Sequence, residues 1–309
     1  MKITIKRITS LLLIIIISTF FASYIYSHLS EFKQIALADP EKITLLILIT
    51  LIAAILNGLI IKYLAEPFSI KLDFKEWFGL ATITTFYNTI MPMRSGLFTK
   101  AAYLKKKHAF SFTNFIAMMA GIYVINLFVS GIIGFLSLVI IYVKYKIFNL
   151  PIALLFLGIL LVTSMIVIFS PKLPETNREF LNKFIRVING WHLIKNNTKV
   201  ITISATVALL QIIINAFATL LSFRMIFFEI DFVRAVFITS IGTLSVLIGI
   251  TPASLGITEG LAILTGWVLG ITTAKSLAAA LIRRLASTAI IFILGPIFSY
   301  ILLKHKPGK

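Results

Sequence analysis

The sequence predicts an all-α polytopic membrane protein with about six full spans, two re-entrant helical hairpins and an inverted-repeat architecture. The first observation is composition, because 59% of the 309 residues are hydrophobic and only 13% are charged, far outside the range of soluble domains. The second is a Pro-x-x-x-Gly pattern that occurs twice in apolar regions, from Pro92 to Gly96 and from Pro252 to Gly256, 160 residues apart. The third is the uneven placement of lysine and arginine along the chain.

Six apolar runs are long enough to cross the roughly 30 Å hydrocarbon core of a bilayer as helices. They are Ile8–Tyr26, Ile43–Leu64, Asn114–Val143, Ile152–Phe169, Val200–Phe223 and Leu277–Leu303. The first run follows a basic N-terminus like that of a signal peptide, but it is longer than a signal core and no small-x-small cleavage site follows it. We therefore interpret it as the first span.

Two further apolar regions, Trp77–Leu104 and Ala235–Leu269, contain the Pro and Gly breaks. Both residue types interrupt helices, and a broken helix is tolerated in a bilayer only where it is buried in protein or lines a wet cavity. Each region is long enough for two half-length helices and too polar at its centre for one clean span. Each is therefore predicted to enter the membrane and return on the same side.

Lysine and arginine counts set the orientation, since cytoplasmic loops are enriched in them. The N-terminus, the loops flanking the first hairpin, the loop at 171–199 and the C-terminal tail together hold 19 of the 29 basic residues, and the opposite loops hold 7. In this count Lys100 belongs to the cytoplasmic flank of the first hairpin. Both termini are therefore expected in the cytoplasm of a multi-pass protein of the cell (inner) membrane.

The chain then divides into a first membrane repeat, residues 1–150, and a second, residues 151–309, which is inverted because each half makes three full crossings. The second repeat includes a basic cytoplasmic linker at 171–199, interpreted as an amphipathic helix on the inner leaflet or as a solvated linker. These loops and the anionic leaflet that they face account for the net charge of +18. Nucleic acid is not an expected partner, because no basic stripe alternates with aromatic residues in a solvated segment.

Charged residues inside apolar regions are the candidates for function, because a charge at membrane depth is costly and is expected to face a cavity or a partner. Glu259 is the only acidic one, interpreted as a proton or head-group site, as the counter-ion of an arginine, or as solvated near the outer interface. Arg94 lies inside the first break, at the position that matches Ser254 in the second. A head-group role is weighed against snorkelling to the cytoplasmic face, and the hairpin tip also offers backbone N–H groups to an anion.

Arg283 and Arg284 lie near the start of the last apolar run. They fall within the first two turns of the helix if it begins near Leu277, and they cap it at the interface if it begins at Leu285. Adjacent helical residues point about 100° apart, so at most one of the two arginines is expected to share a cavity with Glu259. A guanidinium suits a lipid phosphate, because it can donate two parallel hydrogen bonds.

Other polar residues point to less specific roles. Four amides, Asn57, Asn88, Gln211 and Asn215, lie in apolar regions, and hydrogen bonding between helices is the favoured interpretation. The chain has no cysteine, which excludes thiol and disulfide chemistry. All four histidines lie in or beside loops and none belongs to a His-Glu-x-x-His motif, so no metal and no cofactor are expected.

Two motifs resemble signatures of the lysylphosphatidylglycerol synthase transmembrane-domain family, also called flippase-like domain proteins. The stretch Asn88–Gly96 resembles the N-terminal signature, and Thr251–Glu259, followed by Arg283, resembles the C-terminal one. The resemblance implies structural breaks at Pro92, Gly96, Pro252 and Gly256, and head-group binding by Asn88, Arg94, Glu259 and Arg283. The chain departs from the family at Leu97, where a glutamate is usual, and at Ala253-Ser254, where a glycine is commoner.

The resemblance also implies a helical bundle that moves lipid. In the best-known members this module moves aminoacylated phosphatidylglycerol between leaflets, and a soluble aminoacyl-transferase domain follows it. This sequence ends six residues beyond its last apolar position, so the translocation half alone is expected.

The leading hypothesis is therefore a lipid-translocating protein and not an enzyme. Its expected partners are membrane lipids with an anionic or zwitterionic head group, and a homo-oligomer is left open. One alternative is an integral transferase acting on a lipid-linked substrate, which needs membrane-proximal acids or a histidine base, and the sequence has no Asp-x-Asp pair. The other is a membrane scaffold that recruits a cytoplasmic partner through residues 171–199.

Overall fold

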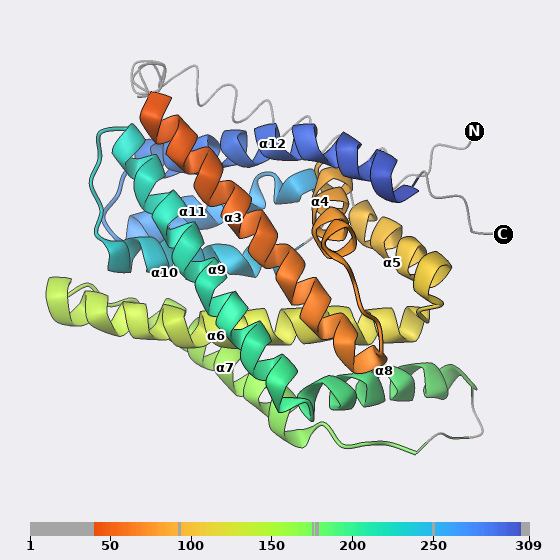
Figure 1. Ribbon diagram of the computed structural model, residues 1–309. Helices are drawn as coiled ribbons and strands as arrows, with labels where there is room; N and C mark the ends of the chain where they lie inside the picture. The colour runs from red at the N-terminus through yellow and green to blue at the C-terminus, as the bar shows by residue number, and fades with distance from the viewer. Residues whose placement is uncertain (1–39, 92–93, 175, 177–178, 249–250, 304–309) are drawn as a thin grey trace, which may run out of the picture.

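The computed structural model describes residues 40–91, 94–174, 176, 179–248 and 251–303, and these residues fold into helices joined by short loops (Figure 1). The elements are α3 (Pro40–Ala65), η2 (Glu66–Phe68), α4 (Phe74–Ile90), α5 (Ser95–His108), α6 (Phe112–Tyr145), α7 (Leu150–Phe169), α8 (Glu179–Lys195), α9 (Thr198–Met225), α10 (Phe232–Gly242), η3 (Thr243–Leu247), η4 (Pro252–Ser254), α11 (Ile257–Val268) and α12 (Thr273–Leu303).

Five of the described helices are long and apolar enough to cross a membrane: α3, α6, α7, α9 and α12. Each contains one of the apolar runs predicted as spans, and the helices extend those runs by a few residues. The first predicted span, Ile8–Tyr26, lies outside the described residues. A multi-pass helical membrane protein is thereby confirmed.

Polar residues at the helix starts show why these elements begin where they do. The side chains of Ser111, Asn149 and Asn197 accept backbone N–H groups of α6, α7 and α9. Asp73 and Asp231 do the same at α4 and α10. Such caps satisfy backbone donors that have no partner within the helix, which matters most where water is scarce.

Both regions predicted to be broken form pairs of shorter helices. The first region divides into α4 and α5, which pack against each other, with the break around residues 91–94. Pro92 itself lies outside the described residues. The second region divides into α10 and α11, joined by η3 and η4, and Pro252 is the first residue of η4. The helices α5, α10 and α11 have 14, 11 and 12 residues, each too short to cross a bilayer alone.

The packing brings the two halves of the chain into close contact. The helices α3 and α9 run side by side across the front of Figure 1. The helix α4 packs on α12, and α10 packs on α6. Each broken region therefore rests on the last long helix of the opposite half.

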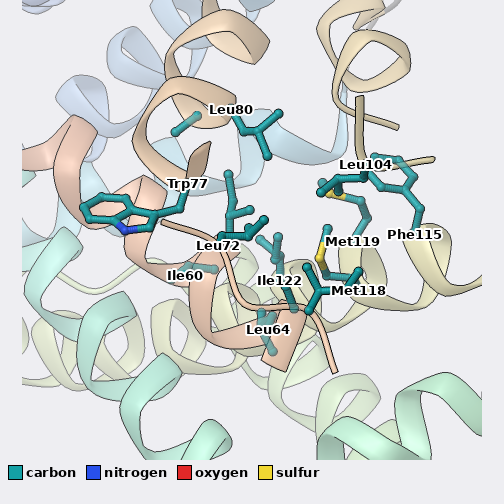
Figure 2. Packing of buried hydrophobic residues seen from close by; sticks show 14 of the residues in the cluster. Ile60, Leu64, Leu72, Trp77, Leu80, Leu104, Phe115, Met118, Met119 and Ile122 are labelled. Carbon is teal, nitrogen blue, oxygen red and sulfur yellow. The ribbon is translucent and has the colours of Figure 1, made fainter. Parts of the chain in front are cut away.

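Buried apolar side chains fill the space where α3, α4, α5 and α6 meet (Figure 2). Leu64, Leu80, Leu104 and Met118, one from each of these helices, have no exposed surface. Close van der Waals packing of this kind holds membrane helices together, since lipid tails are as apolar as the side chains. A second buried cluster joins α6, α7, α9 and α10.

The surfaces of α7 and α8 differ. The helix α7 exposes a largely apolar face, with Leu161 at 59% and Phe169 at 72% exposure, as expected for contact with lipid tails. The basic linker at 171–199 contains the amphipathic helix α8, so it is not a plain solvated linker. Trp191 and Ile194 of α8 are buried against α6, where Gly121 leaves room for them.

Candidate functional site

A polar cavity of about 480 Å³ lies between the two broken regions. Its lining comes from α3, α4, α5, α6, α9, α10, α11 and α12 and from the 3-10 segments near the second break. An adjoining cavity of about 550 Å³ shares several of these residues, including Asn57, Asn215 and Arg283. The polar lining is unusual for the interior of an apolar helical bundle.

The cavity lies well inside the long helices. Asn57 of α3, Asn215 of α9 and Arg283 of α12 each lie at least eight residues from the nearer end of the helix. Arg283 follows the first residue of α12, Thr273, by ten positions, which is about 15 Å along the helix at 1.5 Å per residue. The arginines of α12 are therefore not caps at its start, because the helix begins before both of the expected starting points.

At the first break the chain turns sharply, and a side chain holds the turn. Arg94 adopts a left-handed conformation with φ 52° immediately before α5. The Asn88 side-chain oxygen accepts the Gly96 backbone N–H at 2.9 Å, so the end of α4 is tied to the start of α5. The Arg94 guanidinium donates to the Tyr123 hydroxyl at 3.1 Å and to the Ser245 carbonyl at 3.4 Å. Arg94 thus links the first break to α6 and to the second broken region.

Gly96 is required by close approach of the backbones. A Cβ atom at this position would lie 2.0 Å from the Thr84 carbonyl oxygen of α4, far inside van der Waals contact. At their other ends the same two helices are joined by the buried Glu76 carboxylate of α4. It accepts hydrogen bonds from Tyr103 and Lys107 of α5 at 2.9 and 2.8 Å. The pair α4 and α5 is therefore fixed at both ends.

The second break shares one backbone feature with the first, a left-handed residue two positions before the glycine of the motif. Ala253 and Ser254 are both left-handed, with φ 51° and 52°, and Gly256 has φ 83°. Glycine suits this last conformation because it has no Cβ. The Gly256 N–H donates to the Glu259 carboxylate at 2.8 Å. Gly96 and Gly256 thus hold equivalent places in the two motifs and both donate to a side chain.

Glu259 is 1% exposed and forms an ion pair with Arg284, whose Nε lies 2.5 Å from the carboxylate. Arg284 also donates to the Ala253 carbonyl at 3.2 Å. The expected role of Glu259 as the counter-ion of an arginine is confirmed. The resemblance to the family implied a site role for Arg283, but the arginine that pairs with Glu259 is Arg284.

Arg283 has a different environment. Its guanidinium donates to the Thr219 hydroxyl at 2.7 Å and to the Asn215 side-chain oxygen at 3.3 Å, both on α9. Arg283 and Arg284 both line the cavity. The expectation that at most one of them would share a cavity with Glu259 is therefore wrong, because this cavity is wide enough to receive side chains that leave α12 in directions about 100° apart.

Lys100 is the functional candidate that the sequence analysis missed. It was counted with the cytoplasmic flank of the first hairpin, but it lies within α5, is 4% exposed and lines the cavity. The three lysines that follow, Lys105, Lys106 and Lys107, are the ones that end the helix at the surface. The spacing carried a signal, because Lys100 follows Gly96 by four residues and so lies on the same helical face as the break.

All four amides line one or both cavities. Asn88 and Asn215 also make hydrogen bonds between elements, as expected, to Gly96 and Arg283. Tyr123 and Asn126 of α6 also line the first cavity, and sequence reasoning had not distinguished them from their apolar neighbours.

A second charged cluster lies outside the cavity, at the start of α10. The Asp231 carboxylate accepts a hydrogen bond from the Tyr145 hydroxyl at the end of α6. Burial raises the pKa of Asp231, but this hydrogen bond, the Arg234 backbone N–H and the nearby charges of Lys144 and Arg234 outweigh it and lower the pKa below its usual value. The cluster anchors α10 to α6.

These observations define a multi-pass membrane protein with a positively charged cavity among its long helices. The chain belongs to the family of the lysylphosphatidylglycerol synthase TM region, whose model matches residues 7–295. The resemblance drawn from the two motifs is thereby confirmed, and a membrane lipid-related function is consistent with it. Comparisons with curated proteins and with solved structures found no match.

Proposed function

We propose that this protein moves a phospholipid or a related lipid between the leaflets of the cell membrane, with the head group held between two re-entrant hairpins. The observation that carries the proposal is the cavity, whose lining brings Arg94, Lys100 and Arg283 together among the long apolar helices. A polar head group needs such a path across the hydrocarbon core, while the lipid tails stay outside. Guanidinium groups suit a phosphate, since they donate paired hydrogen bonds.

The packing supports an inverted repeat with α3 equivalent to α9, α4 to α10, α5 to α11 and α6 to α12. If a two-fold axis in the membrane plane relates the halves, equivalent contacts should occur twice. The contact of α4 with α12 has its counterpart in that of α10 with α6, and the equivalent helices α3 and α9 pack on each other. Sites at the interface of inverted repeats, lined by broken helices, are common in transporters.

This arrangement places the two hairpins on opposite sides of the bilayer. The α4–α5 pair then enters from the cytoplasm and returns there, and the α10–α11 pair enters from outside. Both termini are cytoplasmic in this proposal. The two breaks meet near the middle, where Arg94 of one contacts the Ser245 carbonyl near the other.

The two alternatives lack a supporting observation of this kind. A transferase needs a base in reach of its substrate, whereas the one carboxylate among the described lining residues already accepts hydrogen bonds from Arg284 and Gly256. A scaffold role would use α8, which does not require a polar cavity.

Purified protein in liposomes with fluorescent phospholipid separates these functions. A membrane-impermeant quencher added outside measures how fast lipid leaves the inner leaflet, without cofactor or cytoplasmic partner. We expect faster exchange than in protein-free liposomes, and a loss of at least tenfold in Arg283→Ala. Arg224→Ala is the matched control, because Arg224 is exposed at the end of α9 and does not line either cavity. Exchange no faster than in empty liposomes would contradict the proposal.

A further inference from the structure

The cavity lining has an excess of positive charge. Among the described residues it contains four cationic side chains, those of Arg94, Lys100, Arg283 and Arg284, and one acidic side chain, that of Glu259. The Glu259 carboxylate is occupied by Arg284 and by the Gly256 N–H. Among the described lining residues, no carboxylate is left to balance Lys100 and Arg283.

Lys100 is the clearest of these cations. Its side chain is 96% buried, given an exposed fraction of 4%, and it has no hydrogen-bond or ion-pair partner in the described part of the chain. An ammonium group has three donors and no acceptor, so only an acceptor from outside the protein can satisfy it at this depth. A buried and unpaired charge is strongly disfavoured unless a ligand balances it.

Arg283 has donors to spare. A guanidinium has five N–H groups, and here its contacts are two neutral oxygens, of Thr219 and Asn215. These contacts orient the side chain from α9 and do not neutralise it. Arg283 is thus held in place with its charge available to an anion.

Among the described lining residues, the carboxylate of Glu259 and the ring of Tyr123 are already engaged by arginines. An ammonium group is recognised by a free carboxylate or by the open face of an aromatic ring. The carboxylate is taken by Arg284, and the Arg94 guanidinium lies 5.8 Å from the centre of the Tyr123 ring. A head group that carries an amine would bring it close to three positive side chains.

We propose that the cavity selects an anionic lipid head group that has a phosphate and no ammonium, and that it discriminates against zwitterionic and aminoacylated head groups. This inference rests on the proposed function, and it narrows the expected partners to lipids of net negative charge. It also separates this chain from the aminoacylated lipid in the name of its family. Lys100 and Arg283 are the residues that set the selectivity.

Binding to the detergent-solubilised protein tests the selectivity without any transport. The probes are short-chain phosphatidylglycerol, phosphatidylethanolamine and lysylphosphatidylglycerol, titrated separately and followed by native mass spectrometry. We expect phosphatidylglycerol to bind at least tenfold more tightly than the other two. Equal or tighter binding of either amine-containing lipid would overturn the proposal. Inorganic phosphate is a fourth probe, and binding as tight as that of phosphatidylglycerol would show a site for free anions instead.

Substitution of Lys100 tests whether the cavity causes the selectivity. Lys100→Met keeps the length of the side chain and removes its charge, so the preference for phosphatidylglycerol should fall at least tenfold. Lys100→Arg should retain the preference, and it also controls for a folding defect in the methionine variant. The matched control is Lys105→Met, because Lys105 is exposed on the same helix. An unchanged preference in Lys100→Met would also overturn the proposal.

The liposome assay distinguishes failure of the proposed lipid transport from failure of the proposed head-group selectivity. If phosphatidylglycerol binds selectively but no lipid exchanges between leaflets, the proposed transport fails and the selectivity stands. If lipids exchange at equal rates whatever their head group, transport stands and the selectivity fails.

Discussion

The two breaks in this protein share a left-handed residue before the glycine and differ in charge. Arg94 and Ser254, which are equivalent in the repeated motif, both have φ 52°. Two residues later, each glycine donates its N–H to a side chain, that of Asn88 in the first break and that of Glu259 in the second. The first break thus contains a cation and is tied by a neutral amide. The second contains no cation and is tied by a carboxylate.

The difference shows how two similar sequence motifs can build an asymmetric cavity. The carboxylate of the second break is paired with Arg284 of α12, so its charge is neutralised locally. The first break has no acid in the equivalent place, and Arg94, together with Lys100 of α5, lines the cavity with positive charge. The motifs coincide with the breaks in the helices, and the side chains decide which part of the cavity is positive.

The largest effect is expected at the ion pair that only the second break has. In Arg284→Ala the Glu259 carboxylate stays buried without its partner, so stability should fall by about 3–5 kcal/mol, the usual cost of breaking a buried pair. Glu259→Gln should cost less, because it leaves the more exposed partner behind. Unfolding in detergent measures both.

The double variant is the internal check on this pair. Residues in contact are strongly non-additive, so Arg284→Ala combined with Glu259→Gln should be more stable than Arg284→Ala alone. Additive losses in the two single variants would mean that the pair does not hold the second break.

A smaller effect is expected at the glycine of the first break. Gly96→Ala places a Cβ 2.0 Å from the Thr84 carbonyl, so α4 and α5 must separate, at a cost of about 1–3 kcal/mol. The matched control is Gly260→Ala in α11, where an added Cβ has no neighbour within 4 Å. Equal stability of the two variants in the same unfolding assay would show that the first pair is not closely packed.

The smallest effect is expected at the amide that ties the first break. Asn88→Ala removes one neutral hydrogen bond, the acceptor for the Gly96 N–H, and should cost about 0.5–1.5 kcal/mol. Asn88→Asp supplies a charged acceptor and makes the first break chemically similar to the second. It should retain the hydrogen bond and weaken the binding of anionic lipid, as measured by native mass spectrometry. Unchanged binding in Asn88→Asp would separate this residue from the site.

The sequence predicted the parts of the fold that depend on local patterns. Uninterrupted apolar runs located the five described spans, and the repeated Pro and Gly located both breaks. It could not predict the partner of Glu259, because that choice depends on the rotation of α12 and on its start at Thr273, before the apolar run begins. Arg283 and Arg284 are indistinguishable by pattern, although one pairs with an acid and the other with α9.

Lys100 is a second residue whose place could not be predicted from the sequence. It is close in sequence to the lysines at 105–107, so a count of basic residues assigns it to the cytoplasmic loop with them. In the structure a turn of α5 separates it from them, and its side chain is buried against the cavity. Tertiary packing, which the count does not contain, decides whether a lysine near the end of an apolar helix faces water or a site.

The central claim is that two inverted hairpins enter the membrane from opposite sides and return, and cysteine accessibility tests it most directly because the native chain has no cysteine. Exposed positions flank both hairpins, so Lys71→Cys and Lys106→Cys report on the first, and Glu229→Cys and Thr272→Cys on the second. Intact cells are treated with a membrane-impermeant maleimide. The account predicts that positions 71 and 106 are both protected and that positions 229 and 272 both react. Reaction at 106 with protection at 71 would make the first hairpin a full crossing and would contradict the inverted architecture.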